Sequence, residues 1–144
     1  MFLEIVLEFN QSNLEMYGDS SNHPKLTLIV VKKRHHTRFF AYNPAKDETR
    51  NLNIGAVVDT TIVHPYQNNF YLNAHQAFQG VNHPSLYHVI LDEIGFTADE
   101  LQLLTFQLCF TDPRSSASEA IPSVVHQADI AANKARDLFY NNNE

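Results

Sequence analysis

The sequence predicts an α/β fold in which a sheet of short strands comes before two helices. Apolar runs of strand length occur at residues 26–31, 57–63, 70–74 and 86–91, and helical patterns follow at residues 97–110 and from residue 122 onward. Elements in this order pack as layers around one core. No repeat, low-complexity segment or linker divides the 144 residues, so we expect a single domain.

The composition indicates a globular protein, because 44% of the residues are hydrophobic and only 18% are charged. Cys109 has no second cysteine to pair with and lies between apolar residues, which favours a buried thiol in a reducing compartment. No apolar run approaches the roughly 20 residues that span a membrane. We therefore expect no membrane partner and a cytoplasmic location, with the nucleus as the alternative.

Two stretches at the start of the chain are expected to differ in structure. Residues 2–17 carry an apolar stripe at helical spacing, although the start of this stretch also fits a strand. After a turn-rich break, residues 25–38 are expected to form one long strand. Its first half is apolar enough to be buried on both faces, as in parallel sheets. Residues 39–42 are expected to extend this strand and residues 43–50 to form a polar loop.

Both helices near the end of the chain have clear start signals. Thr97 and Glu100 form a capping box before a leucine stripe that should end near Phe110. Pro122 is expected to open the last helix. Its apolar side would carry Val125, Ala128, Ala132, Ala135 and Phe139, and its opposite side His126, Asp129 and Asn133.

The positive charge of the chain is concentrated in one place. Four of the ten Lys and Arg residues fall between Lys32 and Arg38, in a chain whose formal net charge is −6. On a strand, Arg34, His36 and Arg38 would share one face and offer donors to a phosphate backbone. The alternative is a solvated edge strand, charged to discourage aggregation. The net acidity is compatible with binding but argues mildly against a freestanding nucleic-acid-binding domain.

A series of motifs in order resembles the Piwi domain of Argonaute proteins, which carry a small guide RNA. The resemblance covers residues 25–136 and rests on Val-Lys-Lys-Arg-His-His-Thr-Arg at 31–38, Gly-Ala-Val-Val-Asp-Thr at 55–60, Asn-Phe-Tyr-Leu at 69–72 and Ile-Pro at 121–122. It implies a partial RNase H-like fold, a mixed sheet flanked by helices, of which this apparently truncated domain holds the later part. His88, inside an apolar strand, is expected to be a core histidine.

The resemblance also implies a set of RNA-binding residues. They are Lys33, Arg34, His36, Arg38, His75, Gln79, His83, Arg114, His126 and Lys134. Several positions depart from the family pattern. His83 and Lys134 stand where the family often has Arg, and His126 stands where it often has Tyr. Asp112 stands where the family usually has an aromatic residue and would place a negative charge beside the RNA path. For His75 an ordinary loop histidine is the alternative.

The same resemblance implies one catalytic position. Piwi domains that cut RNA hold two divalent ions through several carboxylates and a final His or Asp. Asp129 matches that final position, and its carboxylate suits Mg²⁺. The alternative is an exposed Asp on the solvent side of a helix. The other carboxylates lie upstream of the basic strand in the family, and nothing before Lys25 resembles them, so the chain alone is expected not to cleave RNA.

By resemblance, then, the chain belongs to small-RNA-guided gene silencing, with a guide RNA, a complementary target RNA and silencing-complex proteins as partners. Two hypotheses remain open. The chain is part of a slicing enzyme that uses Mg²⁺, or it is a non-catalytic or decayed Argonaute fragment that acts only in RNA binding or protein contact.

Overall fold

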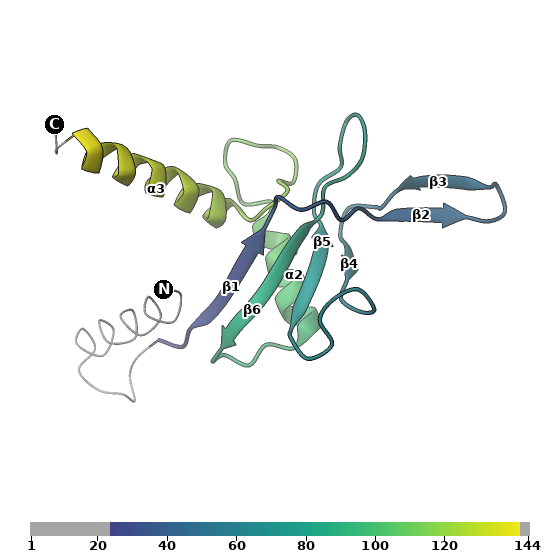
Figure 1. The fold of residues 1–144 in the computed structure, drawn as a ribbon, viewed down its shortest axis with the longest axis horizontal. Helices are drawn as coiled ribbons and strands as arrows, with labels where there is room; N and C mark the ends of the chain where they lie inside the picture. The colour runs from purple at the N-terminus through teal and green to yellow at the C-terminus, as the bar shows by residue number, and fades with distance from the viewer. Residues whose placement is uncertain (1–23, 142–144) are drawn as a thin grey trace.

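The computed structural model describes residues 24–141, so the helix expected at residues 2–17 lies outside the described residues. The strands are β1 (Thr27–Lys32), β2 (Phe40–Asn43), β3 (Glu48–Asn51), β4 (Ala56–Val58), β5 (Asn69–Asn73) and β6 (Ser85–Asp92), and the helices are α2 (Ala98–Leu108) and α3 (Ser123–Asn141). One sheet has the strand order β1-β6-β5-β4, and β2 pairs with β3 in a separate hairpin. The hairpin and α3 project from opposite ends of the sheet (Figure 1).

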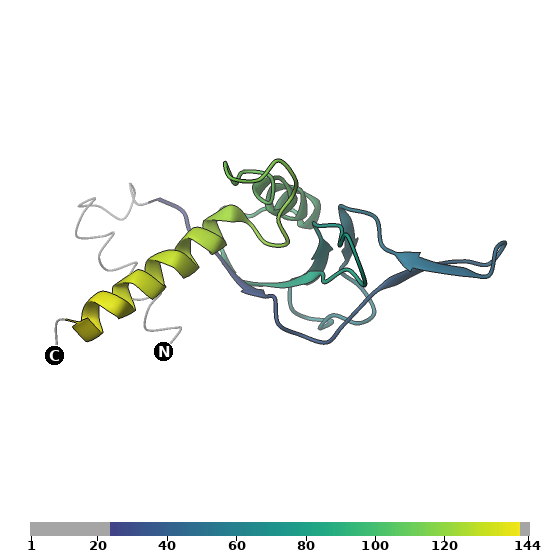
Figure 2. The ribbon, with the colours of Figure 1, turned by 90° about the horizontal axis from the view of Figure 1, so that it is seen from above.

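The helix α2 covers one face of the sheet, which gives the α/β layering predicted from the sequence (Figure 2). Phe70, Leu72, Tyr87, Leu101 and Cys109 form the buried cluster between sheet and helix. The Phe70 and Tyr87 rings stack across β5 and β6, with centroids 5.0 Å apart and planes inclined by 11°. Each large side chain buried in this way stabilises the fold by about 1.5–3 kcal/mol.

β1 is shorter and less buried than the sequence analysis expected. It ends at Lys32 instead of Arg38, and among residues 24–141 it lies at the edge of the sheet, where it pairs antiparallel with β6. Its apolar residues are half-buried, so the expectation of burial on both faces is wrong. Its partner explains the early end, because Lys32 pairs with Leu86 near the start of β6, and Pro84, just before β6, has no N–H to continue a ladder.

The hairpin β2–β3 was missed by the sequence analysis, which joined residues 39–42 to the first strand and read residues 43–50 as a loop. Phe40 pairs with Asn51 and Asn43 with Glu48, so the chain reverses over the four residues between. Asp47 adopts the left-handed conformation at φ 49°, which Asp tolerates better than most residues. The Asn43 side chain accepts a hydrogen bond from the Ala45 amide at 3.1 Å and supports the same turn.

The two helices begin where the sequence placed them. The Thr97 hydroxyl accepts a hydrogen bond from the Glu100 amide, and the Glu100 carboxylate accepts one from the Thr97 amide at 2.9 Å, which completes the predicted capping box. α3 begins after Pro122, and its first residue is held by a 2.6 Å hydrogen bond between the hydroxyls of Ser123 and Thr111. From Ala131 to Phe139 every side chain of α3 is exposed. No described helix is long and apolar enough to cross a membrane.

Candidate nucleic-acid interface

The basic segment, which we define as residues 33–39, crosses the end of the sheet between β1 and the hairpin (Figure 1). His35 and Phe39 pack edge-on against the Tyr71 ring at centroid distances of 5.4 and 5.1 Å. Arg34 and His36 are exposed instead. His35 is therefore turned toward the sheet between the exposed Arg34 and His36, as the predicted alternation requires, but Lys33 is exposed as well and the segment forms no strand.

Arg38 departs from this alternation because its guanidinium turns back onto the protein. Its Nη1 donates to the carbonyls of His35 and Thr37 at 2.9 and 2.7 Å, and its Nη2 donates to Nδ1 of His83 at 2.6 Å. The side chain is half-buried. The predicted ladder of Arg34, His36 and Arg38 is therefore incomplete, since only the first two extend into solvent.

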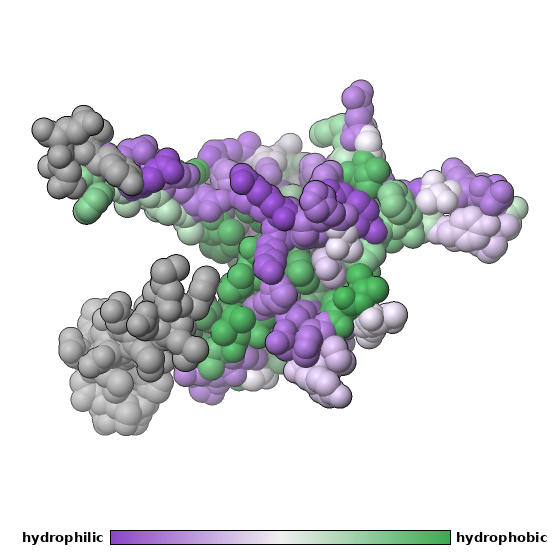
Figure 3. Space-filling view, viewed as in Figure 1, coloured by the Kyte–Doolittle hydropathy of each residue, from purple (hydrophilic) through white to green (hydrophobic). Residues whose placement is uncertain are grey.

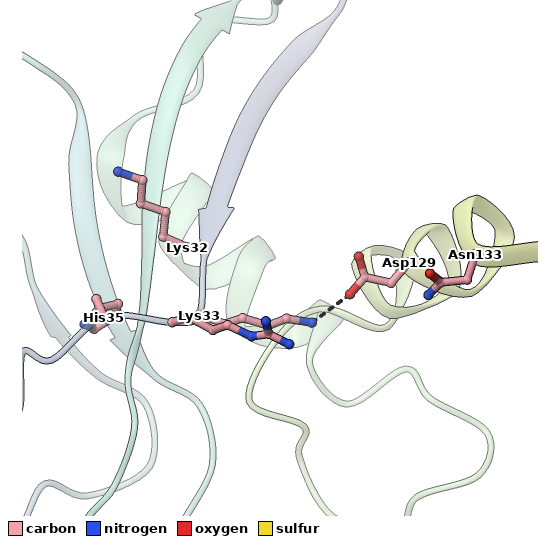
Figure 4. A pocket seen from close by; sticks show the side chains of 6 residues that line it. Lys32, Lys33, His35, Asp129 and Asn133 are labelled. Atoms are coloured by element: carbon pink, nitrogen blue, oxygen red, sulfur yellow. Dashed lines mark hydrogen bonds and ion pairs between the residues drawn. The ribbon is translucent and has the colours of Figure 1, made fainter. Parts of the chain in front are cut away.

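A shallow cavity of about 650 Å³ opens where the basic segment approaches α3. It is lined by Lys32, Lys33, Arg34, His35, Asp129 and Asn133. Figure 4 shows the Lys33 ammonium directed at the Asp129 carboxylate, with Asn133 one turn further along the helix. The polar stripe predicted for α3 thus faces the basic segment through Asp129 and Asn133.

Lys33 and Asp129 form an ion pair with 2.7 Å between Nζ and Oδ2. The hydrogen bond and charge of Lys33 lower the pKa of the Asp129 carboxyl, and the charges of His126 and Arg34 add to this effect. Both side chains are about half exposed, at 44% and 54%. Solvent screens such a pair, so it orients the two groups more than it stabilises the fold.

The described residues do not fit a magnesium centre. Asp129 is already paired with Lys33 and is surrounded by further positive charge. Within residues 24–141, no three His, Cys, Asp or Glu side chains lie close enough to hold a metal ion. A two-metal site needs several carboxylate oxygens around each ion. The assignment of Asp129 as a magnesium ligand stays a prediction that requires carboxylates from outside the described residues.

The loop between β5 and β6 carries His75, Gln79 and His83. His75 is half-buried, and its Nδ1 donates to the Ser118 carbonyl at 2.7 Å, so this ring ties the loop to residues 111–122. Gln79 and His83 are exposed, and His83 contacts the basic segment through Arg38. The structure therefore brings His83 to the basic segment and gives His75 a structural contact as well.

Arg114 forms a bidentate ion pair with Asp112. Its Nε and Nη2 donate to the two carboxylate oxygens of Asp112 at 3.0 and 2.7 Å. The Asp112 carboxylate is 5% exposed, whereas the Arg114 side chain is 59% exposed. Hydrogen bonds from the Arg114 side chain and amide hold the pKa of Asp112 well below its usual range. The charge that Arg114 presents to solvent is thus largely compensated.

The remaining positions are less connected. His126 and Lys134 are both exposed on α3 and are not among the residues that line the cavity beside Lys33. His88 is half-buried, and its Nδ1 contacts the Asn69 side-chain oxygen at 2.9 Å. Burial, followed by the charge of Lys32, lowers the pKa of His88. This agrees with the structural role expected for His88.

Comparison with known proteins identifies the domain. The Piwi domain profile matches residues 4–139. The chain belongs to the Piwi domain family. It is 46% identical over 117 residues to protein argonaute 5 of Arabidopsis thaliana and 45% identical over the same length to protein argonaute 11 of Oryza sativa subsp. japonica. Each match covers 78% of this chain but only 12% and 13% of those proteins, respectively.

Solved structures give the same assignment for the Piwi fold. The C-terminal lobe of a budding yeast Argonaute superposes with a TM-score of 0.73 at 30% identity, covering 85% of this chain and 26% of that one. Kluyveromyces polysporus Argonaute, solved with a guide RNA, gives 0.70 at 31% identity and covers 85% of this chain and 16% of that one. The predicted partial RNase H-like fold is thereby confirmed.

One buried polar residue near the candidate RNA-binding residues was not singled out from the sequence. Asn82 is 2% exposed, and its side chain accepts from the Ala77 amide at 2.9 Å and donates to the Leu52 carbonyl at 3.0 Å. It therefore fixes the loop that carries His75, Gln79 and His83. The sequence could have indicated this role, because Asn82 lies two residues after Gly80 and two before Pro84. Asn in such turn-rich segments often forms hydrogen bonds with nearby backbone groups.

Proposed function

We propose that this chain binds the sugar-phosphate backbone of a small guide RNA within an Argonaute-like silencing protein. The proposal rests on the cations that the basic segment and Lys32 present at the end of the sheet. Lys33 and Arg34 line the cavity between this segment and α3, and His36 extends into solvent. In the space-filling view, hydrophilic side chains gather where the segment crosses the sheet, while hydrophobic ones lie over β1 and β6 (Figure 3).

The chemistry of these groups favours phosphate over bases. Lysine and arginine donors on an exposed surface attract the RNA backbone without reading sequence, which suits a carrier of many guides. The similarity to an Argonaute solved with a guide RNA supports the same ligand class. A complementary target RNA and silencing-complex proteins complete the proposal as partners in RNA interference, in the cytoplasm or the nucleus.

The test is the salt dependence of RNA binding. The full 144-residue chain would be titrated with a short single-stranded RNA by fluorescence anisotropy at several salt concentrations. Lys33→Ala and Arg34→Ala should each weaken binding and reduce the salt slope by about one unit. Lys46→Ala is the matched control, because Lys46 is also an exposed cation and lies in the turn of the hairpin, away from the cavity. Binding that is absent, or independent of salt, would overturn the proposal.

A second candidate function, in which the chain binds RNA without taking part in cleavage, is favoured by the Lys33–Asp129 pair. A carboxylate engaged by an ammonium at 2.7 Å is poorly placed to hold Mg²⁺. The slicing alternative requires carboxylates from outside the described residues. A cleavage assay with Mg²⁺ on the longest recoverable form, compared with Asp129→Ala, separates the two. A rate that is unchanged by the substitution would exclude Asp129 as a ligand.

A further inference from the structure

The hairpin β2–β3 presents two aromatic rings to solvent on one side. Phe40 and Tyr42 alternate with Ala41 on β2, so both rings point to the same face of the strand, about 6.6 Å apart along it. Phe40 is 49% and Tyr42 61% exposed. We call this surface the aromatic face. Exposed apolar groups that lie side by side, unlike scattered single ones, point to an interaction surface.

The Tyr42 ring is held in place by the turn of its own hairpin. Its hydroxyl donates to Oδ1 of Asp47 at 2.8 Å. This bond restricts a side chain that would otherwise sample several rotamers in solvent. Less conformational entropy is therefore lost when a flat ligand covers the ring, so the aromatic face is partly preorganised for such a ligand.

The base of the hairpin is fixed relative to the basic segment. Phe40 follows that segment directly and pairs with Asn51. The Asn51 side chain donates to the Gly80 carbonyl at 2.9 Å and accepts from the Asn82 amide at 3.2 Å, which ties β3 to the loop between β5 and β6. The hairpin thus projects from the end of the sheet that the basic segment crosses (Figure 1). An RNA strand held by the basic segment can continue onto the aromatic face.

The hairpin offers such a strand aromatic surface rather than net charge. Its two cations, Lys46 and Arg50, are balanced by Asp47 and Glu48. Aromatic side chains displayed on strands stack bases of single-stranded RNA, because every base has a π-face whatever its identity. We propose that the aromatic face is a stacking platform for unpaired bases of an RNA whose backbone lies on the basic segment. This inference rests on the proposed function and adds a contact with bases to one with phosphates.

The experiment separates the bases from the backbone. A short single-stranded RNA and an abasic strand of the same length, which keeps every phosphate, would be titrated by fluorescence anisotropy. The wild-type chain should bind the RNA at least about fivefold more tightly than the abasic strand. A variant that carries both Phe40→Ala and Tyr42→Ala should bind the two strands about equally, with an unchanged salt slope, because stacking releases no counterions. Tyr66→Ala is the control, since Tyr66 is 93% exposed in the loop between β4 and β5, away from the hairpin.

A pair of single variants distinguishes stacking from apolar contact and keeps the test decisive if the double variant folds poorly. Tyr42→Phe keeps the ring and should keep most of the preference for bases. Tyr42→Leu keeps an apolar side chain without a ring and should lose part of that preference. Full preference in Tyr42→Leu would overturn the inference, because a face that binds an apolar protein segment is served equally well by leucine.

The remaining outcomes separate this inference from the proposed function. Equal binding of RNA and abasic strand by the wild-type chain, or a full preference for RNA in the folded double variant, would overturn the inference and leave the proposed function standing. An absence of binding to both strands would overturn the proposed function and the inference together.

Discussion

At the scale of single residues, two carboxylates determine how much positive charge the interface presents. Asp112 compensates Arg114 through a bidentate contact, and Asp129 compensates Lys33 through a single one. The sequence analysis expected Asp112 to place a negative charge beside the RNA path, but only the fold shows that its carboxylate pairs with Arg114. It placed Asp129 by resemblance as a metal ligand and could not anticipate Lys33, because the two residues are 96 positions apart.

The Asp112 pair predicts a dependence of stability on pH. Because the pKa of Asp112 is lowered in the folded chain, its contribution is fully present above the unfolded value of about 4 and is lost as the pH falls below it. Asp112→Asn should therefore lower the melting temperature near neutral pH, and the gap from wild type should narrow under acid conditions. Thermal melts followed by circular dichroism at several pH values would measure this. A gap that stays constant down to the acid limit would contradict the prediction.

At the scale of elements, the sequence predicted what depends on local patterns. The capping box at Thr97, the start of α3 after Pro122 and the three strands β4, β5 and β6 were placed from such patterns. The predicted length of the first strand was wrong. The sequence of the basic segment continues the strand pattern, but β1 ends where its partner β6 begins, just after Pro84. The hairpin was missed because Phe40 pairs with Asn51 in another segment, and the local pattern of neither segment indicates that pairing.

The Lys33–Asp129 pair joins the basic segment to α3. Removal of its negative charge should change the affinity for RNA more than it changes the stability of the fold. Asp129→Asn should leave the melting temperature nearly unchanged, because the pair is half exposed and screened. It should tighten binding of single-stranded RNA several-fold at low salt, since the cavity loses a negative charge and Lys33 becomes available. Anisotropy titrations at low and high salt would test this, with Asp99→Asn on the first turn of α2 as control. Weaker binding by Asp129→Asn would show that the carboxylate serves the RNA site.

At the scale of the whole molecule, stability depends on one core and the interface lies at its margin. Leu72 is 0% exposed within the core between β5 and α2, whereas Ile90 on β6 is 60% exposed. The Tyr71 ring, 9% exposed, supports the basic segment directly. The cations of the interface are thus displayed by a framework that does not depend on them.

This arrangement predicts a clear contrast between core and surface substitutions. Leu72→Ala should lower the free energy of unfolding by about 2–5 kcal/mol, because it removes buried methyl groups and leaves a cavity. Ile90→Ala should change it by less than about 0.5 kcal/mol. Urea unfolding of the 144-residue chain would measure both. Similar losses for the two variants would mean that the exposed face of the sheet is also packed in solution.

The pairing of β1 with β6 also determines the order in which the chain assembles during synthesis. Thr27 pairs with Asp92, so β1 emerges from the ribosome well before the strand that completes its ladder. Closing so long a loop costs entropy before any contact is gained, whereas the β2–β3 hairpin closes locally as soon as it is made. The nascent chain must therefore carry the segment that leads into the RNA interface unpaired until β6 has been translated.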